Sequence, residues 1–146
     1  MAARSNARSA QHSGARFIAG ISAAGLVTAF LAGCSAKDPD EALCEDMVKA
    51  VNATGARSSD ELEDSDKKLK AGRNLQIAAH NNKGSQYSDA LELYGRFTEA
   101  EAKLAQESSN SNYREEKWAL EVRMNEERTE EKLDEFYKKC LAFRDE

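Results

Sequence analysis

Apolar side chains downstream of residue 38 recur every three or four positions, the spacing that gathers them on one face of an α-helix. No strand pattern of alternating apolar and polar residues stands out. Asp38 and Pro39 suit the N-cap and first turn of the first helix, and clusters of polar turn formers separate the later ones. The pattern predicts four helices, over residues 38–52, 58–80, 85–107 and 113–143.

The composition favours the same fold class. The chain contains a single proline and is rich in Ala, Glu, Lys, Leu and Arg, which have high helix propensity. We therefore expect an all-α domain with one disulfide, and two architectures stay open. The four helices, which are unequal in length, can form a small up-down bundle. Alternatively, the chain forms a long helical hairpin with a short N-terminal helix joined to its base.

The aromatic residues of the predicted helices are most simply core residues. Trp118 has an alternative role, because a tryptophan near the far end of a bundle can be an exposed anchor for a partner protein. We expect the core position for it as well. The set consists of Tyr87, Tyr94, Phe97, Trp118, Phe136, Tyr137 and Phe143.

The N-terminal segment has the pattern of a secretory leader. Its first sixteen residues contain Arg4, Arg8 and Arg16 and no acid, and an apolar stretch follows over residues 17–32. As a helix this stretch would be about 24 Å long at 1.5 Å per residue. The hydrocarbon core of a bilayer is roughly 30 Å thick, which favours a signal peptide over a membrane-spanning helix, the alternative.

The end of the apolar stretch, Leu31-Ala32-Gly33-Cys34, resembles the lipobox of bacterial lipoproteins. The resemblance implies that a signal peptidase recognises Leu31, Ala32 and Gly33 and cleaves before Cys34. It also implies that the Cys34 thiol carries diacylglycerol, with fatty chains such as palmitate, as the membrane anchor. The chain would then divide into a signal peptide (1–33), an anchor and spacer (34–38) and a helical domain (39–146). Its location would be the extracytoplasmic face of the plasma membrane, or the outer membrane in organisms that have one.

The charge of the mature chain limits its partners. The leader takes three of the 21 basic residues and none of the 26 acids, so 18 basic residues remain and the formal charge becomes −8. A nucleic-acid-binding surface needs the opposite sign. Like charges also repel at an anionic lipid surface, so the anchor itself must hold the protein at the membrane.

Two cysteines remain once Cys34 is assigned to lipid. Cys44 and Cys140 are even in number, and an oxidising compartment favours a disulfide between them. The alternatives are a redox pair or a metal site. Nearly a hundred residues separate the two thiols, unlike the C-x-x-C motif, and His80 is the one histidine that could complete a zinc site. We therefore expect a disulfide, with no metal and no cofactor.

Catalytic chemistry has few candidate residues. Ser65 and Lys68 fit the S-x-x-K motif of penicillin-recognising enzymes, but the partner motifs are missing and the segment is a charged helix surface. We expect no enzymatic activity and assign no catalytic residue. A row of acids at i, i+4 spacing in the last helix could instead dock a basic protein surface or collect cations loosely, or it could be a solvated face. This acidic ridge consists of Glu126, Glu127, Glu130, Glu131, Asp134 and Glu135.

Together these features predict a lipid-anchored, non-enzymatic protein-interaction module of the cell envelope. Its partner would be another envelope protein or an incoming protein, and not a nucleic acid. A more specific hypothesis is a phage- or plasmid-type exclusion lipoprotein, but no residue in the sequence favours it over other interaction modules. The alternative is a receptor for a small ligand or a cation, with its site between the helices.

Overall fold

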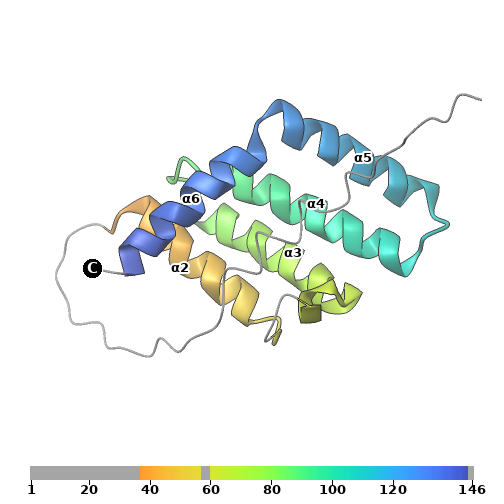
Figure 1. Cartoon of the computed structure of the whole chain (residues 1–146), viewed down its shortest axis with the longest axis horizontal. Helices are drawn as coiled ribbons and strands as arrows, with labels where there is room; N and C mark the ends of the chain where they lie inside the picture. Colours follow the sequence, from red (N-terminus) through yellow and green to blue (C-terminus); the bar gives the residue numbers. More distant parts are fainter. Residues whose placement is uncertain (1–36, 57–59, 145–146) are drawn as a thin grey trace, which may run out of the picture.

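The computed structural model describes residues 37–56 and 60–144, and every regular element in these ranges is helical. The predicted all-α class is therefore confirmed. Five α-helices and a short 3₁₀ helix form a bundle (Figure 1). The elements are α2 (Pro39–Asn52), η1 (Asp60–Glu63), α3 (Ser65–Asn81), α4 (Ser88–Gln106), α5 (Ser111–Glu126) and α6 (Thr129–Arg144).

Helices α3 and α4 form the centre of the bundle. The short turn between Asn81 and Ser88 makes them antiparallel neighbours. Helix α2 packs along α3, and α5 and α6 return along α4 on the other side (Figure 1). Helix α6 reaches past α4 to contact α2, so the last helix closes the bundle onto the first.

Two glycines allow α3 and α4 to approach with their backbones in contact. A Cβ atom on Gly72 would lie 2.7 Å from the Gly95 carbonyl oxygen and 2.7 Å from the Glu99 nitrogen. A Cβ atom on Gly95 would lie 2.8 Å from the Gly72 carbonyl oxygen. Small residues beside them, Ala71 and Ala79, are also buried. Helices α3 and α4 can therefore pack this closely because glycine and alanine occupy the contact, and not because large side chains interlock across it.

The buried core runs through the middle of the bundle, and Phe136, Leu43, Leu91 and Leu133 are among its most completely buried side chains. The expected aromatic core is confirmed for Tyr87, Tyr94 and Phe136, which are buried, and Phe97 and Phe143 pack partly against them. Tyr137 is half-buried. The expectation for Trp118 is wrong, because its side chain is 67% exposed.

The second predicted helix begins later than expected. A 3₁₀ turn occupies residues 60–63, and the α-helix starts at Ser65. Asp64 is the N-cap: its carboxylate accepts hydrogen bonds from the backbone N–H groups of Asp66 and Lys67, both at 3.1 Å. The preceding turn buries Leu62. A strong cap next to a buried leucine therefore moves the helix start away from the acids at 60 and 61.

The predicted fourth helix is two helices, α5 and α6, so the bundle has five helices and not four. The break lies at Glu127 and Arg128, and Arg128 has a φ of +53°. This left-handed conformation ends α5, and the backbone N–H of Arg128 bonds to the Asn125 carbonyl at 3.2 Å. The bend turns α6 back toward α2, so the predicted bundle is confirmed with one helix more than expected, and the last segment packs along the body instead of overhanging.

The left-handed Arg128 provides a test of this turn. We expect Arg128→Gly to raise the free energy of unfolding by about 1 kcal/mol, because glycine adopts this conformation without the steric cost of a side chain. The lost ion pair with Glu131 is on the surface and contributes little. Urea unfolding of both proteins measures the difference. A loss of stability on substitution would contradict this account of the break.

The disulfide between Cys44 and Cys140 is present, and their Cα atoms are 5.5 Å apart. Cys44 is in the second turn of α2 and Cys140 is near the end of α6. Because α5 and α6 together run back along α4, the start of α2 and the end of α6 lie at the same end of the body (Figure 1). We call this end the disulfide end.

Candidate interaction surface

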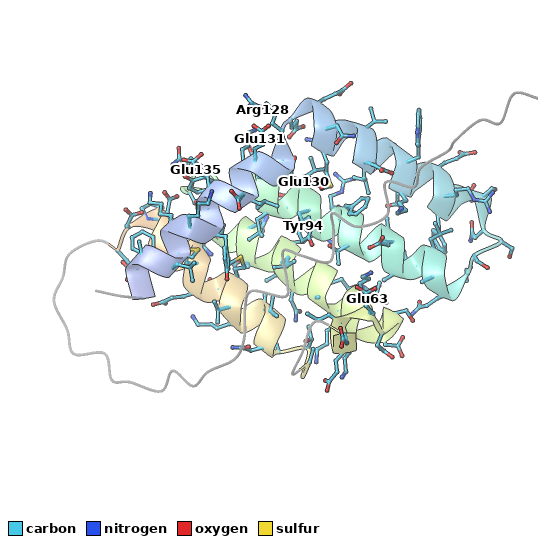
Figure 2. The ribbon with its side chains drawn as sticks, viewed as in Figure 1. Glu63, Tyr94, Arg128, Glu130, Glu131 and Glu135 are labelled. Carbon is cyan, nitrogen blue, oxygen red and sulfur yellow. A yellow bond between two sulfur atoms is a disulfide. The ribbon has the colours of Figure 1, made fainter. Side chains whose placement is uncertain are left out.

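The acidic ridge predicted from sequence is not continuous. It requires one helix through residues 126–135, and the bend at Arg128 places Glu126 and Glu127 on α5 or just after it, with the other four acids on α6. Figure 2 shows Glu131 and Glu135 along the outer edge of α6, whereas Glu130 lies on the flank turned toward α4. The six acids therefore lie on two helices and do not form one continuous helix face.

Most acids of the former ridge are already engaged. Glu127 pairs with Arg123 at 2.6 Å, Asp134 with Lys138 at 2.7 Å and Glu131 with Arg128. Glu135 accepts a hydrogen bond from the Tyr87 hydroxyl at 2.8 Å. Within the described ranges, Glu126 and Glu130 form no ion pair. Residues 37–56 and 60–144 also contain no group of three or more acids, histidines or cysteines arranged to hold a metal ion.

Helix α5 carries apolar residues on two opposite faces. Leu120 and Met124 are buried against α4, with exposed fractions of 5% and 6%. Trp118 and Val122, one turn apart on the far side, are 67% and 36% exposed. A helix that contributes to one core needs only one apolar face. We call the side bearing Trp118 and Val122 the outer face of α5.

A sequence pattern could have revealed this outer face. Trp118, Leu120, Val122 and Met124 alternate with other residues, and four apolar positions with a period of two fall on opposite sides of a helix rather than on one. We instead predicted a core position for Trp118. In the structure, Leu120 and Met124 take that place.

A buried polar cluster lies at the disulfide end. Asp40, which is 6% exposed, accepts a hydrogen bond from the Ser85 hydroxyl at 2.6 Å and one from the Lys139 ammonium at 2.5 Å. These contacts join α2, the turn before α4, and α6. The ammonium of Lys139 also lies 6.0 Å from the centre of the Tyr87 ring and 5.8 Å from that of Phe143. The cluster supplements the disulfide in holding the three segments together.

The carboxyl of Asp40 is ionised in this cluster. Burial alone would raise its pKa, but the hydrogen bonds from Lys139 and Ser85 outweigh burial and lower the pKa below its ordinary value of 3.8. The hydrogen bond to Asp40 in turn raises the pKa of the Lys139 ammonium above its ordinary value. The pair is therefore charged throughout the neutral pH range, and it has a structural role.

Asp40 predicts an acid-sensitive contribution to stability. A carboxyl whose pKa is lower in the folded state stabilises the fold above its unfolded pKa, and this contribution disappears as the pH falls through the folded pKa. We expect Asp40→Asn to lower the free energy of unfolding by about 1 to 3 kcal/mol at pH 7, the usual contribution of hydrogen bonds to a charged group. The gap should begin to narrow below the ordinary pKa of 3.8 and close as the pH falls through the lower pKa of the folded state. Urea unfolding from pH 7 to pH 2.5 measures both, and a gap independent of pH would contradict the ionised state.

Tyr87 connects this cluster to α6. Burial, and then the hydrogen bond to the Glu135 carboxylate, raise the pKa of the Tyr87 hydroxyl. The ring lies 5.0 Å from that of Phe136, centre to centre. Tyr87 is therefore a protonated donor that holds the Glu135 carboxylate and packs on the core.

The remaining predicted positions fall in two groups. His80 is exposed on α3, and Lys68 of the S-x-x-K motif pairs with Glu101 at 3.0 Å and with Glu63 at 3.4 Å. The lipobox residues Leu31, Ala32, Gly33 and Cys34 lie outside the described residues.

Among the helices that are described, none combines the length and apolar character needed to cross a bilayer. No protein-family model, curated protein or solved structure matches the chain.

Proposed function

We propose that this protein is a lipid-anchored, extracytoplasmic interaction module of the bacterial cell envelope, which binds another protein without catalysing a reaction. The exposed Trp118 on the outer face of α5 is the observation that carries the proposal. Tryptophan is among the side chains that contribute most to binding at protein interfaces. An exposed tryptophan beside an exposed valine is costly to leave in water and is explained if a partner covers both.

The rigid body behind this face supports the same function. Leu120 and Met124 fix α5 against α4, and the disulfide and the Asp40 cluster join α2 to α6. A binding residue on a well-packed helix loses little conformational freedom when a partner docks. The proposed anchor at Cys34 is only four residues before the N-cap Asp38, so it would hold the disulfide end close to the bilayer.

The proposed lipid anchor and membrane location have a direct test. Intact-mass spectrometry of the full chain made in a bacterium should show a mature protein that begins at Cys34 and carries the mass of diacylglycerol. Cys34→Ser should abolish both the lipid and the membrane attachment. An uncleaved chain with a free Cys34 thiol would overturn the lipoprotein assignment.

The proposed binding role is tested by site-specific photo-crosslinking in cells that make the full chain. A photoreactive side chain is placed at one exposed position at a time: at 118 or 122 on α5, at 77 on α3, or at 138 on α6. We expect at least one position to yield an adduct with one defined protein. If no position yields a protein adduct, the interaction function is wrong.

A further inference from the structure

The outer face of α5 is a compact apolar patch within a charged surface. Trp118 and Val122 are neighbours at i, i+4 spacing, so their side chains lie side by side along the helix. Ile77 and Leu141, the other large exposed apolar residues of the described ranges, stand on α3 and α6. Single exposed apolar residues are ordinary, but an adjacent aromatic and aliphatic pair is a typical interface centre.

The charge around this patch is negative. Glu115 and Glu121 lie three residues before and after Trp118, and Glu126 lies four residues after Val122, so all three border the patch. Each is exposed, and none forms an ion pair with another described residue.

The basic residues of α5 do not pair with these acids. Arg123 pairs with Glu127 at 2.6 Å, and the guanidinium of Arg114 donates to the Ser108 carbonyl at 3.1 Å, in the turn that precedes α5. The Lys117 ammonium lies 5.4 Å from the centre of the Phe97 ring. Arg114, four residues before Trp118, keeps its charge, so three acids and one base border the patch. The patch is therefore apolar in the centre with three unpaired carboxylates at its border. A partner that covers it must supply positive charge, because desolvating unpaired carboxylates is costly.

A second copy of the chain fits this face less well. In an antiparallel pairing that stacks Trp118 on Val122 of the other copy, residues equally far from Leu120 in opposite directions come together. Of the three acids at the border, one would then meet a basic residue, Arg114 of the second copy, and the other two would meet Asn125 and Ala119. A parallel pairing would place each acid near its own equivalent, which costs free energy.

The bilayer does not fit this face. Figure 1 shows α5 in the half of the body away from the first turn of α2 and the last turn of α6. A chain anchored just before Asp38 would hold the disulfide end toward the membrane and α5 away from it. Anionic lipids would also repel Glu115, Glu121 and Glu126.

We propose that the outer face of α5 binds a cationic amphipathic segment of a partner protein, whose apolar side chains cover Trp118 and Val122 while its lysines or arginines pair with Glu115, Glu121 and Glu126. This inference deepens the proposed function and rests on it, because it names the binding face and the chemistry of the partner. The segment needs an apolar ridge about one turn long, with basic residues on both sides.

A peptide titration tests the chemistry of the face. The probe is a fluorescently labelled amphipathic helical peptide of leucine and lysine, compared with a leucine–glutamate and a serine–lysine peptide of the same length. We expect saturable binding of the leucine–lysine peptide alone, weakened by added salt. Trp118 is the only tryptophan of the chain, so its emission should shift to the blue as the peptide covers it.

Matched variants locate the binding. Trp118→Ser should weaken it about 30-fold or more, as loss of an interface anchor does, whereas Ile77→Ser should leave it unchanged. Replacing Glu115, Glu121 and Glu126 together with glutamine should weaken binding about tenfold. The control removes the same number of acids from α6, at Glu130, Glu131 and Asp134. Because these side chains are exposed, thermal unfolding should confirm that all variants fold. Equal weakening by both triple variants, or binding of the glutamate peptide, would overturn the inference.

The crosslinking experiment separates failure of this inference from failure of the proposed function. An adduct from position 118 or 122 that maps to a lysine- or arginine-rich segment of another protein supports the inference. An adduct from these positions with lipid, with a second copy, or with a neutral or acidic segment overturns it. Protein adducts from positions 77 or 138 alone also overturn it, yet they leave the proposed function standing. Absence of protein adducts at all positions overturns both.

Discussion

Replacing Cys44 and Cys140 with alanine is expected to lower the free energy of unfolding by about 4 to 5 kcal/mol, because the disulfide closes a loop of nearly the whole domain. The two residues are 96 positions apart, and cross-linking them restricts the unfolded chain severely. Small domains are commonly stable by only about 5 to 15 kcal/mol, so this loss removes a large share. The start of α2 and the end of α6 should separate first.

Urea unfolding of the double variant and of the reduced native protein should give the same loss. Cys34→Ser is the matched control, since it removes the remaining cysteine without touching the bridge, and it should unfold like the native protein. Amide hydrogen exchange should show faster exchange in α6 than in α4 once the bridge is absent. A double variant as stable as the native protein would mean that packing alone holds the two ends.

The helices were predictable because their determinants are local. Asp38 accepts a hydrogen bond from the Asp40 backbone N–H at 2.8 Å, as its place before Pro39 indicated. The errors occur where no local residue marks a boundary. A glycine at position 128 would have indicated a left-handed residue and the end of a helix. Arg128 adopts this conformation without such a signal, so the sequence pattern predicts a continuous helix there.

The candidate surface was harder to predict because it depends on tertiary packing. Sequence spacing shows that Trp118 and Leu120 point in opposite directions, but only the position of α4 decides which of them is buried. The acidic ridge was predicted on one unbroken helix, and the break at Arg128 divides its residues between α5 and α6. The hydrogen bond between Lys139 and Asp40 joins residues 99 positions apart, and no local pattern indicates it.

The glycines of the α3–α4 contact should not tolerate even one added methyl group. Elsewhere in a helix, alanine is about 1 kcal/mol better than glycine. At Gly72 the added Cβ would lie 2.7 Å from two backbone atoms, which cannot rotate away, so the helices must move apart. Overpacking of this kind costs up to about 3 kcal/mol, and we expect Gly72→Ala to lose about 2 kcal/mol net.

Gly95→Ala forces the same separation of α3 and α4, since its Cβ would lie 2.8 Å from the Gly72 carbonyl oxygen. The double variant should therefore lose less stability than the sum of the two single losses, because the helices need to separate only once. Gly84→Ala is the control: its Cβ would make an ordinary contact at 3.6 Å with Pro39, and its stability should change by less than about 0.5 kcal/mol. Urea unfolding of the four variants measures these values. If Gly72→Ala instead stabilised the protein, the backbone contact between α3 and α4 would be looser than the structure has it, and the additional methyl group would simply be favouring the helix.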